Sequence, residues 1–234
     1  MRSGLARYLI GRAIEAVEIL DPRSLRRQAG GPGAFARQLA GRTVTAAARR
    51  GKFLWLPLDD GRALSAHLGM SGQLLVRGAV AEPHDDVEGA RIAGRVDAHR
   101  AGPMATRAPT LVHEPSIRPR HLRVRLHLAP IDGDASDGAF VDLVDQRVFG
   151  GLHVTDLVPT SDGEPGGRGS PDALLPDDAR HIARDLLDPA LDRRDAAARM
   201  RSSGRAIKTI LLDQRIVSGV GNIYADEGLW AARV

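Results

Sequence analysis

The chain has 234 residues, 43% of them hydrophobic, and its 33 basic and 29 acidic side chains leave a formal net charge of +4. This length allows one large domain or two small ones, each with its own core. No apolar run is long enough for a membrane span or a signal segment, so we expect a cytoplasmic protein without a membrane partner. With no cysteine there is no disulfide or thiolate zinc site, and we expect no metal or other cofactor in this chain. A charge of +4 is too small to establish nucleic-acid binding by itself.

The first part of the chain predicts a short helix followed by strands with tight connections. The helix is expected from Ser3 to Arg12, and Gly51, Gly61 and Gly72 punctuate the apolar segments after it. This spacing is typical of a β-sandwich or barrel rather than of βαβ units. The segments expected as strands are Thr43–Ala47, Phe53–Leu58, Ala63–Leu68 and Gln73–Val76.

The rest of the first domain predicts a surface insertion and two more strands. Residues 77–118 are rich in Ala, Gly, Pro, Arg and Asp without a stable period, which indicates a mobile insertion. His121–Leu128 then alternates, so that one face belongs to a core and the other is either solvated or a binding surface. A last strand, Ala139–Val144, leads to the end of the domain, which covers residues 1–155. The second face of the alternating strand carries His121, Arg123, Arg125 and His127.

Residues 156–171 predict a linker, and residues 172–234 predict a helical domain. Four Gly and two Pro lie between Pro159 and Ser170, a composition that resists regular structure. Strands followed by helices indicate the α+β class, with an N-terminal β-sandwich, a helical domain and a basic groove between them. The expected helices are Asp177–Leu187, Asp192–Met200, Gly204–Asp213 and Asn222–Ala232.

Four motifs resemble, in order, those of the formamidopyrimidine-DNA glycosylase and endonuclease VIII family, and the second and third are similar to its formamidopyrimidine branch. The resemblance implies a base-excision glycosylase with AP-lyase activity that removes 8-oxoguanine and formamidopyrimidines from double-stranded damaged DNA. It also implies a monomer in the cytoplasm, associated with the nucleoid, and a helix–two-turn–helix domain. The motifs are Arg50-Gly51-Lys52-Phe53, His67-Leu68-Gly69-Met70-Ser71-Gly72, Asp145-Gln146-Arg147-Val148-Phe149-Gly150, and the segment from Ile207-Lys208 through Gly219-Val220-Gly221-Asn222 to Asp226-Glu227.

The resemblance assigns three residues to the space that a flipped base leaves in the duplex. An enzyme that flips a base must fill that vacancy, with an apolar wedge and a cation near the orphaned partner. Met70, Arg147 and Phe149 match the family's void fillers, and Arg147 matches the contact to the opposite base. Met70 and Phe149 are each flanked by glycine, which suits exposed turns better than strand interiors. The alternative is that both are core residues, as most Met and Phe are.

The resemblance also implies contacts to the DNA backbone and to the damaged base. Lys208 and Asn222 match residues that grip the backbone, and His121 matches another DNA contact. Lys52 matches a phosphate contact that is assigned proton transfer, for which Arg is unsuitable because it keeps its proton near neutral pH. Glu227 matches a glutamate that recognises or processes the base. The alternatives are a solvated Lys208, an Asn222 that only caps its helix, and a Glu227 on the solvent face.

Relative to the family, this chain is expected to be truncated at both ends. The resemblance starts at Arg2-Ser3-Gly4-Leu5, after the place of the family's N-terminal proline nucleophile and glutamate acid, and the family's zinc finger would follow Val234. We therefore expect little glycosylase activity from these residues alone. Two alternatives remain, a non-catalytic damaged-DNA-binding protein derived from the family and a degenerate product that does not fold stably.

Overall fold

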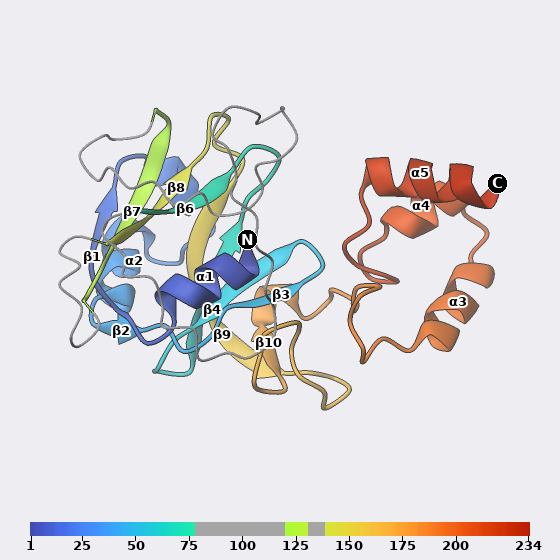
Figure 1. The fold of residues 1–234 in the computed structure, drawn as a ribbon, viewed down its shortest axis with the longest axis horizontal. Coiled ribbons are helices and arrows are strands. Elements are labelled where there is room, and N and C mark those ends of the chain that lie inside the picture. The colour runs from blue at the N-terminus through green and yellow to red at the C-terminus, as the bar shows by residue number, and fades with distance from the viewer. Residues whose placement is uncertain (78–119, 131–138) are drawn as a thin grey trace, which may run out of the picture.

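The protein is described by a computed structural model that covers residues 1–77, 120–130 and 139–234 (Figure 1). The insertion expected at residues 77–118 therefore lies outside the described residues, apart from Arg77. In these described residues, two sheets and two α-helices form the first domain, and three α-helices form the second. Over the described ranges, none of the helices combines the length and apolar character that a membrane crossing needs.

The first sheet of the described residues has the order β2-β1-β7-β8-β6, with neighbours antiparallel. On β7 the apolar residues Leu122, Val124, Leu126 and Leu128 are all buried, which confirms the predicted alternation. A register shift between Ile14 and Ala16 marks a bulge in β1. The strands are β1 (Ala13–Ile19), β2 (Arg42–Thr43), β6 (Gln73–Arg77), β7 (Leu122–Leu128) and β8 (Phe140–Val144).

The second sheet has the order β10-β9-β5-β4-β3 and is also antiparallel. Residues of both sheets share one core with buried residues of α1 (Arg2–Leu9) and α2 (Gly31–Leu39). Each leucine buried there contributes about 1.5–3 kcal/mol. The strands are β3 (Ala48–Arg50), β4 (Phe53–Pro57), β5 (Arg62–His67), β9 (Gly151–Pro159) and β10 (Leu174–Pro176).

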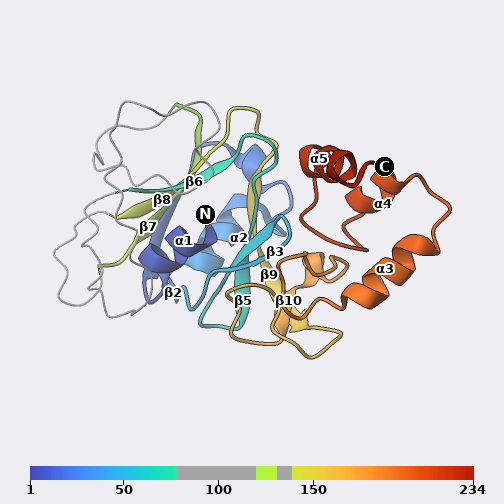
Figure 2. The same cartoon turned by 45° about the vertical axis from the view of Figure 1, so that its right-hand side comes forward.

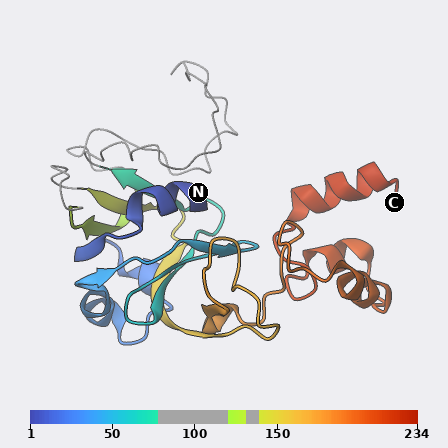
Figure 3. The same ribbon diagram turned by 60° about the horizontal axis from the view of Figure 1, so that its bottom comes forward.

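The second domain contains α3 (Arg193–Arg201), α4 (Ile207–Leu212) and α5 (Asn222–Ala232). Its small core consists of Val217, Val220 and Ala225, with Met200, Leu211 and Leu212 packed against it. Figure 2 shows β3, β9 and β10 on the side of the sandwich nearest these helices, and Figure 3 shows the helices again as a separate body. The predicted α+β architecture, a β-sandwich followed by a helical domain, is confirmed.

The helix predicted from Asp177 to Leu187 is wrong, because only a short 3-10 helix, η2 (Asp177–Ala179), forms there. The backbone of this segment pairs with residues 214–218 instead of with itself. The Ala183 N–H donates to the Gln214 carbonyl at 2.9 Å, and the Arg184 carbonyl accepts from the Ser218 N–H at 3.1 Å. The apolar spacing therefore reflects contacts across the second domain rather than a helix.

The linker predicted at 156–171 also differs from the structure. Strand β9 extends to Pro159, and β10 returns to the same sheet, so the strands of the first domain reach Pro176. The glycine-rich part closes the outer edge of β3, where Arg49 and Arg168 exchange backbone hydrogen bonds of 3.0 and 2.9 Å. A Cβ atom at Gly167 would lie 2.5 Å from the Arg49 carbonyl oxygen, so this approach requires glycine.

Candidate nucleic-acid interface

The turn between β3 and β4 joins the two domains at Gly51. Its N–H donates to Asp185 Oδ2 at 3.0 Å, and the same carboxylate oxygen lies 3.2 Å from Nη2 of Arg49. Gly51 has a φ of +56°, and a Cβ atom there would lie 2.5 Å from Ser218 Oγ and 2.9 Å from the Gly219 nitrogen. The turn is thus fitted to the second domain by backbone contact that only glycine allows.

This docking places Lys52 next to the loop that begins α5. Lys52 Nζ donates to the Val220 carbonyl at 2.8 Å. Gln214 shapes that loop, since its Nε2 donates to the same carbonyl at 3.0 Å and its Oε1 accepts from the Gly219 N–H at 2.9 Å. The side chain of Lys52 therefore contacts the loop at a point two residues before Asn222.

Asn222 is the first residue of α5 rather than its cap. The N-cap is Gly221, and no side chain caps the helix. The capping role considered for Asn222 is therefore wrong, and its exposed side chain stands beside the first N–H groups of an eleven-residue helix. Uncapped N–H groups at this end carry the positive side of the helix dipole, which attracts anions such as phosphate.

Lys208 belongs to the same part of the second domain. It lies on α4, and its Nζ is 2.6 Å from Oδ1 of Asp226 on α5. The side chains of both residues are well exposed, so an incoming phosphate can reach the ammonium group but must compete with the carboxylate. Lys208 is thus exposed to solvent, as the alternative considered from the sequence expected, and it also forms an ion pair with Asp226. Glu227, the next residue on α5, is exposed, as the solvent-face alternative expected.

Two turns at the other end of the candidate interface carry Met70, Arg147 and Phe149. Met70 is 68% exposed and Phe149 is 48% exposed, so the alternative that they are core residues is wrong. Arg147 is exposed as well. The turns touch through glycine, because Gly69 has a φ of +57° and a Cβ atom there would lie 3.0 Å from Cβ of Phe149. The void-filling residues assigned by resemblance thus form one cluster, which we call the wedge.

His121 adjoins the wedge through the backbone, because its carbonyl accepts from the Asp145 N–H at 3.0 Å. The basic face expected on its strand is not available as a whole. Arg123 Nε donates to the Asp145 carbonyl at 2.7 Å, and buried Arg125 makes two hydrogen bonds of 2.7 and 2.9 Å with Asp142. The prediction of a DNA-facing strand is therefore wrong for Arg123 and Arg125, whose guanidinium groups hold the sheet together.

Sequence reasoning missed two arginines beside the wedge, Arg26 and Arg27, which line a small pocket together with His67. Arg26 donates to the carbonyl of Val148 at 2.8 Å and to that of Phe149. Burial lowers the pKa of His67, and the nearby Arg27 and Arg26 lower it further. In the sequence, the available signal was the pair of adjacent arginines, Arg26 and Arg27. Among the described residues, no three His, Asp or Glu side chains gather as metal ligands would.

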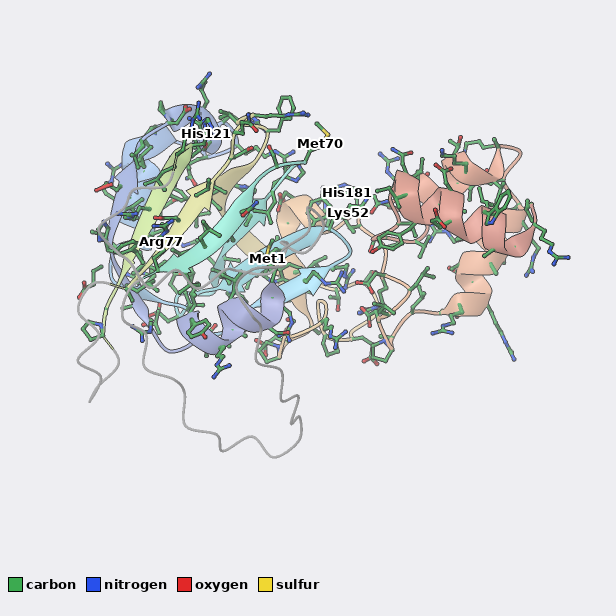
Figure 4. The ribbon with its side chains drawn as sticks, turned by 45° about the horizontal axis from the view of Figure 1, so that its top comes forward. Met1, Lys52, Met70, Arg77, His121 and His181 are labelled. Atoms are coloured by element: carbon green, nitrogen blue, oxygen red, sulfur yellow. The ribbon has the colours of Figure 1, made fainter. Side chains whose placement is uncertain are left out.

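Figure 4 shows Lys52 and His181 together at the junction of the domains, with Met70 on the same side of the sandwich. Phe53, next to Lys52, packs edge-on against the His181 ring at 6.3 Å between centroids. The wedge lies on the first domain, whereas Lys208 and Asn222 lie on the second. The predicted site residues therefore fall into two clusters, and Lys52 of the first domain contacts the second directly through the Val220 carbonyl.

A β-sandwich whose β3–β4 turn is fixed to a small helical domain defines a two-domain α+β fold. Residues 1–152 match the family model of the formamidopyrimidine-DNA glycosylase N-terminal domain, and residues 182–234 match that of its H2TH domain. The chain belongs to the formamidopyrimidine-DNA glycosylase family.

Known proteins agree with this membership. The formamidopyrimidine-DNA glycosylases of Nocardioides sp. and Leifsonia xyli are 44% and 42% identical over the whole of this chain, which spans 61% and 67% of their lengths. The Lactococcus lactis enzyme in complex with DNA containing FAPY-dG has the same fold, with a TM-score of 0.63 and 22% identity. That match covers all of this chain and 66% of the solved chain. A second solved complex of the L. lactis enzyme contains abasic-site DNA and also has a TM-score of 0.63.

Proposed function

We propose that the protein acts in base-excision repair as a glycosylase of oxidised purines, and that the described residues recognise the damaged duplex. The observation that carries this proposal is the wedge, in which two exposed apolar side chains and an exposed arginine lie on two touching turns. Exposed Met and Phe cost free energy in water unless a partner covers them. A duplex with a flipped or missing base offers such cover, because the vacancy is apolar and stacked on both sides.

The roles of the residues follow from the two clusters. Met70 and Phe149 fill the vacancy, and Arg147 contacts the orphaned base. Lys208 and Asn222 hold the DNA backbone, the latter together with the N-terminal amides of α5.

The remaining roles concern the junction of the domains and the damaged base. Lys52 binds a DNA phosphate at the junction of the domains and takes part in proton transfer. His121 contacts the DNA strand beside the wedge. Glu227 acts on the damaged base. The protein binds as a monomer, in the cytoplasm, on the nucleoid.

The test compares binding to two duplexes that differ only in one abasic site. Fluorescence anisotropy over a range of salt concentrations should give tighter binding to the abasic duplex and a steep loss of affinity with salt, because phosphate contacts release counterions. Replacing Lys208 with alanine should weaken binding to both duplexes about equally. It should also reduce the slope of log affinity against log salt concentration by about one.

Replacing Phe149 with alanine should weaken binding to the abasic duplex and leave binding to the intact duplex unchanged. We expect its affinity to fall by about tenfold, because stacking contributes about 1–3 kcal/mol per base. Leu187→Ala is the matched control, since Leu187 is an exposed apolar residue at 73% on the segment before α3. Equal affinity of the unmodified protein for both duplexes, or binding that does not change with salt, would contradict the proposed function.

A further inference from the structure

The wedge is built on one buried carboxylate, that of Asp145. This residue follows β8 and is 1% exposed. Its Oδ1 accepts a hydrogen bond of 2.6 Å from Ser71 Oγ, on the turn that carries Met70. Oδ1 also accepts from the Arg147 N–H at 3.1 Å, and Oδ2 accepts from the Gly150 N–H at 2.7 Å. A single side chain thus binds both turns.

The carboxylate is suited to this task because it stays ionised. Burial alone would raise the pKa of Asp145, but hydrogen bonds from Ser71 and from the N–H groups of Gly150 and Arg147 outweigh burial and lower it. Hydrogen bonds to an ionised acceptor are about twice as strong as those between neutral groups. The two turns are therefore joined by strong contacts in a water-poor place.

The backbone around Phe149 is held in a conformation that it would not adopt alone. Val148 has a φ of 56°, in the left-handed region that a β-branched residue rarely enters. Such strain persists only where the surroundings fix it, and it occurs most often at functional sites. Here Arg26 fixes the turn from one side through the Val148 and Phe149 carbonyls, and Asp145 fixes it from the other.

Close backbone contact prevents the two turns from moving separately. A Cβ atom at Gly150 would lie 2.9 Å from the His67 carbonyl oxygen and 3.1 Å from Asp145 Oδ2. Gly69 approaches Phe149 equally closely from the Met70 turn. A displacement of one turn must therefore displace the other or break the hydrogen bonds to Asp145.

We infer that Asp145 is a positioning residue that couples the Met70 turn to the Arg147–Phe149 turn, so that the wedge enters the duplex as one rigid body. The inference rests on the proposed function. Asp145 itself does not touch DNA, because its oxygens are occupied by protein donors. Its role is to keep Met70 and Phe149 at a fixed separation before the duplex arrives. The two turns therefore lose little conformational entropy when they bind.

Two variants test the coupling, Asp145→Asn and Ser71→Ala. The measured quantities are the ratio of affinities for the abasic and intact duplexes and the fluorescence of 2-aminopurine placed opposite the abasic site. Asp145→Asn should reduce the affinity ratio by about tenfold and Ser71→Ala by about threefold, because charge-assisted hydrogen bonds are lost. Affinity for intact duplex should stay within about twofold, and the 2-aminopurine signal on binding should fall in parallel with the affinity ratio.

A double replacement separates coupling from simple destabilisation. If the wedge is rigid, Met70→Ala should reduce the affinity ratio less in the Asp145→Asn background than in the unmodified protein. Asp162→Asn is the matched control, because Asp162 also has a lowered pKa and accepts from a backbone N–H, but its partner is Arg184. It should leave the affinity ratio and the fluorescence unchanged.

The outcomes distinguish the inference from the function on which it rests. An unmodified protein that does not prefer the abasic duplex overturns the proposed function. A normal preference that survives both Asp145→Asn and Ser71→Ala overturns the coupling alone. If thermal unfolding shows that Asp145→Asn no longer folds, Ser71→Ala decides, because Ser71 lies partly exposed on a turn.

Discussion

The docking of the β3–β4 turn onto the second domain makes a quantitative prediction for Gly51→Ala. The left-handed backbone at Gly51 costs an alanine about 1–2 kcal/mol. Its Cβ would also lie 2.5 Å from Ser218 Oγ and 2.9 Å from the Gly219 nitrogen. Ser218 is buried and the other contact is backbone, so neither yields easily, and overpacking of this kind costs about 1–3 kcal/mol. The sum is about 2–5 kcal/mol, enough to undock the turn and move Lys52 away from Val220.

Gly61→Ala supplies the matched control. Gly61 lies in the β4–β5 turn with a φ of +81°, but a Cβ atom there meets nothing within 4 Å. Gly61→Ala should therefore lower the free energy of unfolding in urea by only the backbone contribution, about 1 kcal/mol. Its DNA binding should not change. Gly51→Ala should lose more stability and weaken binding to intact and abasic duplexes by about tenfold, because Lys52, the proposed phosphate contact, would be displaced from the junction. Equal effects of the two variants on stability and on affinity would refute the docking argument.

Three further predictions concern the charged groups. Asp142→Ala should lower the free energy of unfolding in urea by about 3–5 kcal/mol, because the fully buried carboxylate is an ion partner of two buried arginines; a loss below about 1 kcal/mol would contradict this. Asp226→Asn should raise DNA affinity by about two- to fivefold at low salt and less at high salt, because Lys208 loses a competing carboxylate; an unchanged affinity at low salt would show that the ion pair does not compete. The pKa of Asp162 is lowered to about 2, chiefly by the Arg184 hydrogen bond, so its stabilisation is present above pH 3.8 and is lost as the pH falls towards 2. Asp162→Asn should remove that part of the acid sensitivity, and identical unfolding curves of the two proteins from pH 4 to 2 would count against it.

The sequence predicted the elements whose burial follows a simple period. Strand β7 alternates apolar and polar residues along its length, although Arg125 on the other face is buried as well, and α5 begins and ends where the pattern indicated. Strand β1 was missed because its bulge between Ile14 and Ala16 breaks the alternation, so that Ala16 is exposed where a regular strand would bury it. Helix α2 was missed because Gly-Pro-Gly opens it, a combination that local rules assign to a loop.

The glycine-rich stretch before β10 shows a second limit of reading composition. The glycines were interpreted as the mark of a linker without regular structure, whereas Gly166 and Gly167 are buried under backbone contacts to Leu174 and Arg49. Both uses of glycine follow from its missing Cβ, and sequence alone does not say whether the space is left open or filled. The same ambiguity did not affect Gly69, because the neighbouring Met70 and Ser71 belong to a motif.

The site shows why an arginine facing DNA is hard to tell from a structural one. Arg125 lies on the non-core face by alternation, but the register places Asp142 directly across from it on β8, and the two form a buried pair. The Asp145 carboxylate is only two residues from Arg147. Both of its oxygens, however, accept hydrogen bonds from Ser71 and from backbone N–H groups. The guanidinium of Arg147 therefore makes no ion pair among the described residues. The carboxylate that builds the wedge thus also leaves the Arg147 guanidinium free for the contact to the orphaned base that we propose.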